Sequence, residues 1–384
     1  MRLAVDYTAA ARQGGGIGRY ARELVGALLA AGPEHEWVLM AAAGGLGKRW
    51  RREQARLQSI ATAPEQLSFR SLPLSDNWMA RLWQRLRLPL HAETITGRVA
   101  CFYSPDFVLP PLRRATLALL TVHDLSFLHY PDTFTPPLLR YLETCVPRSI
   151  ARADHILADS EATRQDLIAL LAVPPEKVTT LYSGVSPHFT PQAAPGERGH
   201  LRTRYGIGER PYILAVGTVQ PRKNYVRLME ACAPLAASGD LELVIAGKPA
   251  WLAEPILAAA AERDYVHLLG FTEDGDLPAL YRQAELLAFP SLYEGFGLPV
   301  LEALACGIPV VASSASSVPE VVGEAGLLVS PTDTTAWTAA LRQALEDTAL
   351  RTDLRARGLA RAAEFTWART AARWLDVLET LMAR

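Results

Sequence analysis

The feature that most constrains the fold is the regular alternation of short apolar runs with longer helix-forming stretches. This alternation is typical of parallel sheets that carry helices on both faces. The strands that we expect in the first half span residues 3–7, 37–41, 100–103, 117–122, 155–158 and 178–181. Those that we expect in the second half span residues 212–216, 242–246, 266–269, 286–289 and 310–312. The predicted fold class is therefore α/β, with doubly wound parallel sheets.

The length of the chain indicates two domains. It has 384 residues, more than the roughly 250 that usually surround a single core. Residues 186–199 are rich in proline, glycine and polar side chains, as linkers are. We therefore expect an N-terminal domain over 1–190 and a C-terminal domain over 191–364. Two such sheets would place the carboxyl ends of their strands around a shared cleft.

The composition excludes several classes of protein. The net charge of −1 argues against a nucleic-acid-binding protein, and the 49% content of hydrophobic residues argues against disorder. The cysteines show neither metal-ligand nor disulfide spacing; they are Cys101, Cys145, Cys232 and Cys306. No apolar run approaches transmembrane length, and the N-terminus resembles a strand rather than a signal peptide. We expect a cytoplasmic protein.

The segment between Glu294 and Glu302 is the strongest candidate site. It places two carboxylates eight positions apart around a glycine-rich turn, and Pro299 stands where a helix would take its first residue. The amides of residues 295–300 would then point out of a positive helix end toward an anion. Amides for phosphate and carboxylates for hydroxyls suit a nucleotide sugar. The alternative is an ordinary strand–turn–helix junction with two solvated glutamates.

A basic pair, Arg222 and Lys223, follows the expected strand 212–216. Arginine can bind phosphate oxygens as a fork, while lysine supplies a compact charge. Lys248 ends the next strand in the same way and could reach the same anion. The alternative for the basic pair is a solvated turn, and the two glutamates in the same domain argue against it.

Two further motifs follow expected strands. His123 and Asp124 end the strand at 117–122, where a histidine can donate or accept a hydrogen bond near neutral pH. Otherwise Asp124 caps a turn and His123 is an edge residue. Asp274-Gly-Asp276 matches an Asp-x-Asp metal pattern, but the better interpretation is that Asp276 caps the following helix. No metal site is predicted.

The glycine loop after the first strand contains Gly16-x-Gly18-x-x-Ala21, a weak form of a dinucleotide fingerprint. In a true fingerprint the glycines follow the strand immediately, whereas residues 8–13 intervene here. A loop that lets another ligand or domain approach closely fits better. A nicotinamide- or flavin-dependent oxidoreductase remains a rival, although it would leave the basic pair and the glutamates idle.

An aromatic and basic stretch at 77–90 could lie on an anionic membrane surface. It places apolar residues on one side and also carries arginines; these residues are Trp78, Met79, Leu82, Trp83, Leu86, Arg81, Arg85 and Arg87. A second basic run at 48–52 lies nearby in sequence. The alternative is a helix that packs on the first domain and leaves its arginines in solvent.

These elements, in this order, resemble the family-4 retaining glycosyltransferases of the GT-B fold. The residues that carry the resemblance are Gly15-Gly-Ile-Gly18, His123-Asp124, Pro221-Arg-Lys-Asn224, and Glu294 with Glu302 followed by residues 303–310. The resemblance implies two Rossmann-like domains that face a central cleft. The N-terminal domain would bind the acceptor, and the C-terminal domain would bind a nucleotide-sugar donor. It also implies that a final helix, 365–384, crosses back onto the N-terminal domain.

The resemblance implies a role for each motif residue. Glu294 would hold hydroxyls of the donor sugar, and Glu302 would hold the ribose. Lys223 with Arg222 would neutralise the leaving diphosphate without a metal or other cofactor, and His123 would lie beside the anomeric carbon. The remaining donor contacts would come from Gly16, Ile17, Gly217, Thr218, Lys248, Gly295, Phe296, Gly297 and Leu298. Many relatives carry an arginine at the position of Thr218, so Arg222 would have to replace it.

The family retains the anomeric configuration by front-face attack, with no protein nucleophile. The Pro-Arg-Lys-Asn sequence resembles that of bacterial mannosyltransferases that build surface polysaccharide, which favours GDP-mannose as the donor. UDP-glucose, UDP-N-acetylglucosamine and deoxysugar donors remain alternatives, as does a nucleotide-sugar epimerase. The acceptor would be a saccharide or a lipid-linked saccharide, the latter suiting peripheral membrane contact through 77–90. The sequence leaves the oligomeric state open.

Overall fold

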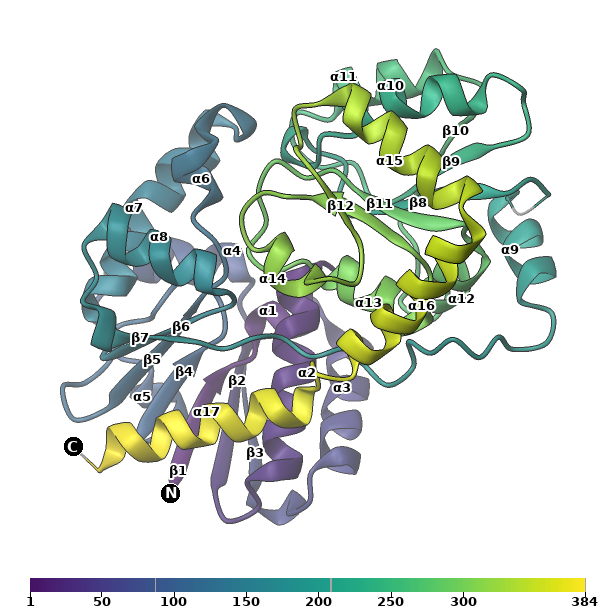
Figure 1. Ribbon diagram of the computed structural model, residues 1–384. Coiled ribbons are helices and arrows are strands. Elements are labelled where there is room, and N and C mark those ends of the chain that lie inside the picture. The colour runs from purple at the N-terminus through teal and green to yellow at the C-terminus, as the bar shows by residue number, and fades with distance from the viewer. Residues whose placement is uncertain (87, 208, 384) are drawn as a thin grey trace. The chain divides into compact units, whose positions relative to one another are not determined.

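The computed structural model describes residues 1–86, 88–207 and 209–383. The chain forms two compact units, each built on its own parallel sheet (Figure 1). Unit 1 comprises Met1–Leu125, Arg140–Gly184 and the chain from Thr366 onward; unit 2 comprises Ser126–Leu139 and Val185–Phe365. The predicted pair of α/β domains is confirmed.

Unit 1 contains a seven-stranded sheet in the order β3-β2-β1-β4-β5-β6-β7, and its strand pairs are parallel. The strands are β1 (Arg2–Asp6), β2 (Glu36–Ala42), β3 (Leu67–Leu72), β4 (Cys101–Ser104), β5 (Leu117–Val122), β6 (His155–Ala158) and β7 (Val178–Thr180). The order reverses direction between β1 and β4. Open α/β sheets bind ligands at the carboxyl ends of the strands beside such a reversal.

The helices of unit 1 lie between its parallel strands in sequence, except for the last helix, which follows unit 2. They are α1 (Thr8–Arg12), α2 (Gly16–Ala31), α3 (Gly47–Ile60), α4 (Asp76–Ala80), α5 (Glu93–Thr96), α8 (Glu161–Leu171) and α17 (Trp367–Met382), with a π-helical turn at Arg81–Arg85. Helix α7 (Pro136–Arg152) begins in unit 2 and continues into unit 1. Short 3₁₀ turns lie at Pro64–Gln66 and Pro175–Lys177.

The stretch 77–90 does not keep its apolar residues on one side, as we expected. Met79 and Trp83 are buried, whereas Trp78 and Leu86 are exposed. Arg87 lies outside the described residues.

The last helix, α17, packs against α2 within unit 1 (Figure 1). Thr366 caps it by accepting a hydrogen bond from the amide of Arg369. Its Trp374 is fully buried, and the indole lies against Trp37 and Tyr103, with ring centroids 6.0 and 5.3 Å away. The apolar side chains on one side of α17 are therefore buried by this contact.

Unit 2 contains a six-stranded sheet in the order β10-β9-β8-β11-β12-β13, also paired in parallel. The strands are β8 (Tyr212–Val216), β9 (Glu242–Ala246), β10 (Val266–Gly270), β11 (Leu286–Phe289), β12 (Val310–Ser313) and β13 (Leu327–Val329). Successive residues of β8 enter different cores: Tyr212, Leu214 and Val216 enter one, while Ile213 and Ala215 enter the other. Both faces of the sheet are thus covered, as a near-continuous apolar strand requires.

The helices of unit 2 form those two covering layers. Side chains of α9 (Glu197–Tyr205), α12 (Leu277–Gln283), α13 (Leu298–Cys306), α14 (Val318–Val322) and the end of α16 (Thr348–Ala362) contribute to one core. Side chains of α10 (Tyr225–Ala236), α11 (Glu254–Ala261) and α15 (Thr334–Glu346) contribute to the other. Helix α9 begins inside the stretch 186–199, so the predicted linker is partly helical.

The segment Ser126–Leu139 lies with unit 2, whereas we expected all of 1–190 to form the N-terminal domain. It contains α6 (Ser126–His129) and a 3₁₀ turn at Pro131–Thr133. Trp251 donates from its indole nitrogen to the carbonyl of Thr133 (2.7 Å) and stacks on Phe134. His129 stacks on Tyr293, with ring centroids 4.9 Å apart. These aromatic contacts attach the segment to unit 2.

No helix in the described parts of the chain is long and apolar enough to cross a membrane.

We expect Trp374→Ala to lower the free energy of unfolding by about 3–5 kcal/mol, because it removes a fully buried indole from the contact between α17 and the rest of unit 1. Urea unfolding measures the change. Met382→Ala is the control, since Met382 on the same helix is exposed and should change stability by about 0.5 kcal/mol or less. Equal losses in the two variants would contradict a stabilising role for the α17 contact.

Candidate functional site

The basic pair follows β8 on a short 3₁₀ turn, Pro221–Lys223, directly before α10. Asn224 ends this turn with a left-handed backbone (φ 58°). Its side-chain amide donates to the carbonyls of Pro290 (3.1 Å) and Pro331 (2.7 Å). Those prolines follow β11 and β13, so Asn224 ties three strand ends together and fixes the position of the basic pair.

Glu294 accepts ion pairs from both members of this basic pair. Lys223 Nζ lies 2.5 Å from Oε1, and Arg222 Nη1 lies 3.2 Å from Oε2. Arg222 also donates to the carbonyl of Tyr293. Burial alone would raise the pKa of Glu294, but the charges of Lys223 and Arg222 outweigh burial and hold that pKa below its usual value. The three side chains together carry one excess positive charge, which favours an anionic ligand.

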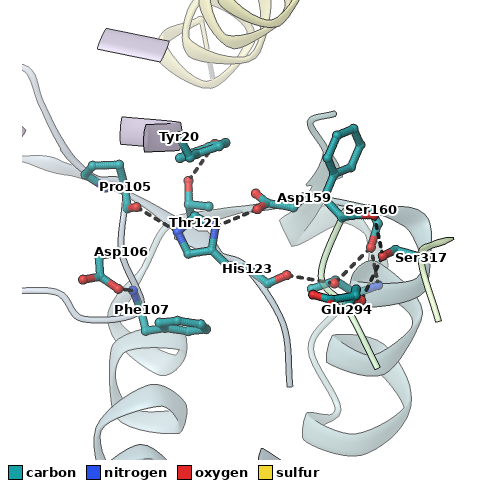
Figure 2. Close-up of polar contacts among 12 residues, drawn as sticks. Tyr20, Pro105, Asp106, Phe107, Thr121, His123, Asp159, Ser160, Glu294 and Ser317 are labelled. Atoms are coloured by element: carbon teal, nitrogen blue, oxygen red, sulfur yellow. Dashed lines mark hydrogen bonds and ion pairs between the residues drawn. The ribbon is translucent and has the colours of Figure 1, made fainter. Parts of the chain in front are cut away.

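Two serines after β12 hold the backbone of the glycine turn. Ser317 Oγ donates to the carbonyl of Glu294 (2.9 Å; Figure 2). It also lies 3.0 Å from the carbonyl oxygen of Phe296, and the amide of Glu294 donates to Ser316 Oγ (2.8 Å). Sequence reasoning did not single out either serine. Their position at the end of a strand next to β11 was the available signal.

The amides of this turn are only partly available. Those of Gly295, Gly297 and Leu298 form no hydrogen bond with any residue that the structure describes. The amide of Val300 donates to the carbonyl of Gly297 (3.0 Å), so the prediction that all amides of 295–300 face a ligand is wrong at that residue. Pro299 occupies the second rather than the first position of α13. Its missing N–H still costs nothing, because the first four amides of a helix have no partner within the helix.

Glu302 lies on α13 and is buried. Its Oε2 accepts a hydrogen bond of 2.8 Å from the hydroxyl of Tyr281 on α12. The two carboxylates of the motif therefore have different neighbours: cations for Glu294 and a phenol for Glu302. Phe296, between them, is buried against Phe365.

The loops after β8 and β9 run side by side. Val219 donates to the carbonyl of Lys248 (2.8 Å), and a Cβ on Gly247 would stand 1.9 Å from the carbonyl oxygen of Gly217. Only glycine permits that approach. The ammonium of Lys248 lies over the ring of Phe271, 4.1 Å from its centroid. Thr218 accepts a hydrogen bond from the side chain of Gln220.

In unit 1, His123 follows β5 and is buried. Its Nδ1 lies 2.6 Å from Asp159 Oδ2, and its Nε2 lies 3.0 Å from the carbonyl oxygen of Pro105 (Figure 2). Rings of Tyr20 and Phe107 contact its imidazole edge to face. Burial would lower the pKa of His123, but the carboxylate of Asp159 outweighs burial and raises the pKa to about 9. The imidazole is therefore charged at neutral pH.

Asp159 is the functional candidate that sequence reasoning missed. It follows β6 as His123 follows β5, and β5 and β6 are paired neighbours in the sheet. Parallel strands bring their carboxyl ends to one edge, so this shared position was a usable signal.

The glycine loop of unit 1 leads into α2, which begins at Gly16. Helix α1 stands between β1 and α2, so the loop does not follow the strand directly, as a dinucleotide fingerprint requires. A Cβ on Gly18 would stand 2.1 Å from the carbonyl oxygen of Gln13, whereas Gly16 faces open space. Ile17 lies in the first turn of α2 and is half-buried.

Asp276 precedes α12, but the prediction that its side chain caps this helix is wrong. The carboxylate instead accepts hydrogen bonds from Tyr205 (2.6 Å) and His200 (2.9 Å) and pairs with Arg204. The carboxylate therefore bonds to these three side chains of α9 and not to the amides of α12. Within the described residues, no three acidic, histidine or cysteine side chains gather as a metal site.

Comparison with known proteins agrees with this geometry. Residues 14–189 match the model of Glycosyltransferase Family 4, and residues 198–361 match that of Glycosyl transferases group 1. The chain is 36% identical over 272 residues to the O-antigen chain mannosyltransferase B of Escherichia coli, covering 69% of this chain and 70% of that protein. The chain belongs to the glycosyltransferase family that these two models describe.

Two further comparisons concern part of a longer protein and a solved structure. It is 36% identical over 229 residues to the serotype-specific mannosyltransferase WbdA of Escherichia coli, which covers 57% of this chain and 28% of that longer protein. The sucrose-phosphate synthase of Thermosynechococcus elongatus has a TM-score of 0.76 at 20% identity, covering 100% of this chain and 99% of the other. The latter comparison confirms the predicted GT-B fold.

The pairing of His123 with Asp159 predicts a pH dependence of stability. Folding raises the pKa of His123 from an unfolded value of about 6.5 to about 9. Its stabilisation is therefore complete below about pH 6.5 and is lost as the pH rises through about 9. Urea unfolding should show a steeper loss of stability between about pH 7 and 9 in the parent than in His123→Gln. Parallel slopes in the two proteins would show that this pair does not stabilise the fold.

Proposed function

We propose that this glycosyltransferase moves a mannosyl residue from GDP-mannose to a saccharide or lipid-linked saccharide during surface-polysaccharide synthesis. The names of the two Escherichia coli relatives support the sugar and the biosynthetic setting. A third relative, 36% identical over 238 residues, is the MMP alpha-(1->4)-mannosyltransferase of Mycolicibacterium hassiacum. The Pro221–Asn224 sequence supports the same donor.

The observation that carries the proposal is the buried cluster of Glu294, Lys223 and Arg222 beside amides that lack partners among the described residues. A nucleotide sugar presents hydroxyls and a diphosphate within a few ångströms of each other. Glu294 accepts hydrogen bonds from sugar hydroxyls, and the two cations bind phosphate oxygens. When the donor binds, its phosphate takes over part of the interaction that Lys223 makes with Glu294. The ammonium of Lys223 therefore stays paired with a negative charge.

The remaining contacts follow from the loops around this cluster. The amides of Gly295, Gly297 and Leu298 serve the diphosphate and sugar, with Phe296 shaping the turn. Glu302 holds the ribose. Its carboxylate would give up the hydrogen bond from the hydroxyl of Tyr281 and accept one from a ribose hydroxyl instead. Gly217, Thr218 and Lys248 line the donor from the loops after β8 and β9. Arg222 takes the place of the arginine that many relatives carry at the position of Thr218.

In this proposal unit 1 binds the acceptor. During transfer His123 would contact the anomeric carbon, with its imidazole kept charged and oriented by Asp159. Gly16 and Ile17, at the start of α2, would contact the donor and the acceptor.

The transfer breaks the bond between the anomeric carbon and the phosphate oxygen, and the electron pair leaves with the nucleoside diphosphate. The acceptor hydroxyl attacks from the same face, and its proton passes to the departing phosphate oxygen, which retains the configuration. Lys223 and Arg222 stabilise the charge that develops on the diphosphate, an electrostatic contribution that requires no metal ion. Glu294 acts as a hydrogen-bond acceptor rather than as a nucleophile.

Lys223→Met should lower kcat by roughly 10²–10³-fold, because it removes a charge that interacts most strongly with the departing diphosphate. Glu294→Gln should likewise lower activity, since the amide replaces a hydroxyl-binding carboxylate. Product formation with GDP-mannose and a mannose-containing acceptor is the measurement. Arg202→Ala, on the exposed face of α9, is the control. Wild-type turnover in a folded Lys223→Met protein would refute this phosphate clamp, and conversion of donor without acceptor would favour an epimerase.

A thermal-shift panel of nucleotide sugars tests the donor. We expect GDP-mannose to raise the melting temperature more than UDP-glucose, UDP-N-acetylglucosamine or NADH, because ligands stabilise the state that they bind. The shift should disappear in Glu294→Gln and persist in Arg202→Ala. A shift with a UDP-sugar and none with GDP-mannose would replace the proposed donor while leaving the glycosyltransferase intact.

A further inference from the structure

The segment Ser126–Leu139, here called the inserted segment, belongs to unit 2, although the chain on either side of it belongs to unit 1. Local hydrogen bonds shape it. The amide of Tyr130 donates to the carbonyl of Ser126 (2.8 Å), and Thr133 Oγ1 donates to the carbonyl of Tyr130 (2.7 Å). None of the donor contacts proposed above involves these residues, so the reason for their attachment to unit 2 is a separate question.

The first attachment of the inserted segment is to the loop after β9. Trp251 donates from its indole nitrogen to the carbonyl of Thr133 (2.7 Å), and its ring stacks on Phe134 with centroids 5.8 Å apart. The loop that carries Trp251 is bonded to the loop after β8, because the amide of Ala250 donates to the carbonyl of Val219 (2.9 Å). The inserted segment therefore contacts loops that contribute to the proposed donor site.

The second attachment is to the loop after β11. The imidazole of His129 stacks on the ring of Tyr293, with centroids 4.9 Å apart and planes 25° apart. The ring of Tyr130 lies 6.3 Å from the same tyrosine ring, at 58° to it. Tyr293 is only 6% exposed, whereas His129 is exposed. The inserted segment thus covers Tyr293 without being buried at that point itself. Strands β9 and β11, which precede the two attachment sites, flank β8 in the sheet.

Tyr293 is connected directly to the basic pair and to the carboxylate that it binds. Its carbonyl accepts a hydrogen bond from the guanidinium of Arg222, and it immediately precedes Glu294. The amide of Leu292 donates in return to the carbonyl of Arg222 (2.9 Å). A displacement of the Tyr293 backbone would therefore move Glu294 and also the hydrogen-bond acceptor of Arg222.

We propose that the inserted segment positions the donor-binding residues of unit 2, with His129 and Tyr293 as the positioning residues. The stack of the two rings fixes the backbone of Tyr293, and that backbone fixes Glu294 and the guanidinium of Arg222. The inference rests on the proposed function, in which Glu294 and Arg222 bind the donor. It assigns no donor contact to His129. Precise placement matters, because a displacement of about 1 Å can lower a rate 10²-fold.

A purely structural attachment is the alternative, and enzyme kinetics separate the two roles. If the inserted segment only stabilised the fold, its loss would reduce the amount of active enzyme, which lowers the apparent kcat and leaves the KM of both substrates unchanged. Displacement of Glu294 and Arg222 would instead weaken the binding of one substrate, so the KM of the donor would rise and that of the acceptor would not.

The test is steady-state transfer by His129→Ala, using the nucleotide sugar that stabilises the parent most in the thermal-shift panel, which we expect to be GDP-mannose. A pair of stacked rings changes an equilibrium constant by up to about tenfold. The donor KM should therefore rise about three- to tenfold, with a parental acceptor KM. His129→Phe keeps a flat ring on Tyr293 and should retain the parental donor KM. Because His129 is exposed, the alanine variant should fold normally, which circular dichroism verifies.

Two further variants complete the test. Phe134→Leu removes the ring that stacks on Trp251 and should also raise the donor KM. His267→Ala is the matched control, because His267 is the second residue of β10, at the opposite edge of the sheet from the strand carboxyl ends. Its Nε2 lies 3.3 Å from Glu242 Oε1, and its replacement should leave both KM values unchanged.

A parental donor KM in His129→Ala, or the same rise in His129→Phe as in His129→Ala, would overturn the positioning role and leave the proposed function intact. Equal rises in the donor and acceptor KM would also overturn it, because the effect would not be confined to the donor. The proposed function itself fails by a different result: no nucleotide sugar stabilises the parent, and Lys223→Met is as active as the parent. That result would remove this inference as well.

Discussion

The buried ion pairs of Glu294 with Lys223 and Arg222 are the interaction on which the candidate site depends. A buried carboxylate is tolerated only when charge and hydrogen bonds compensate the loss of water. That requirement explains the surrounding structure: Asn224 ties the basic turn to two other strand ends, and Ser316 and Ser317 hold the backbone on either side of Glu294. The cluster keeps an excess positive charge, which favours an anionic ligand.

Unit 1 also buries a pair of oppositely charged side chains at its strand ends, in this case a histidine and an aspartate. His123 and Asp159 follow adjacent parallel strands, and each compensates the burial of the other. In both units, the charged groups stand at the carboxyl edge of a sheet whose strands are apolar on both faces. Most side chains of the interior strands are apolar and buried, so the charged groups stand at the strand ends.

Local pattern predicted most of the elements. The apolar runs located the interior strands because a buried strand must be apolar on both faces. Strands β3 and β13 were missed: β3 alternates polar and apolar residues at a sheet edge, and β13 has only three residues. Asp276 was misassigned as a cap because its partners on α9 lie more than seventy residues away. The stretch 77–90 was read as one apolar side, yet Met79 packs inward while Trp78 faces solvent.

The sequence by itself determined the fold class, the family and the identity of the charged motif residues, because periodicity and short motifs are local properties of the chain. Only the tertiary structure decided which of those residues meet. It paired Glu294 with Lys223 and Arg222 across some seventy residues, gave Glu302 a tyrosine instead, and supplied His123 with Asp159. It also attached Ser126–Leu139 to unit 2. Those outcomes depend on strand order, which sets the neighbours at a sheet edge and cannot be derived from local sequence.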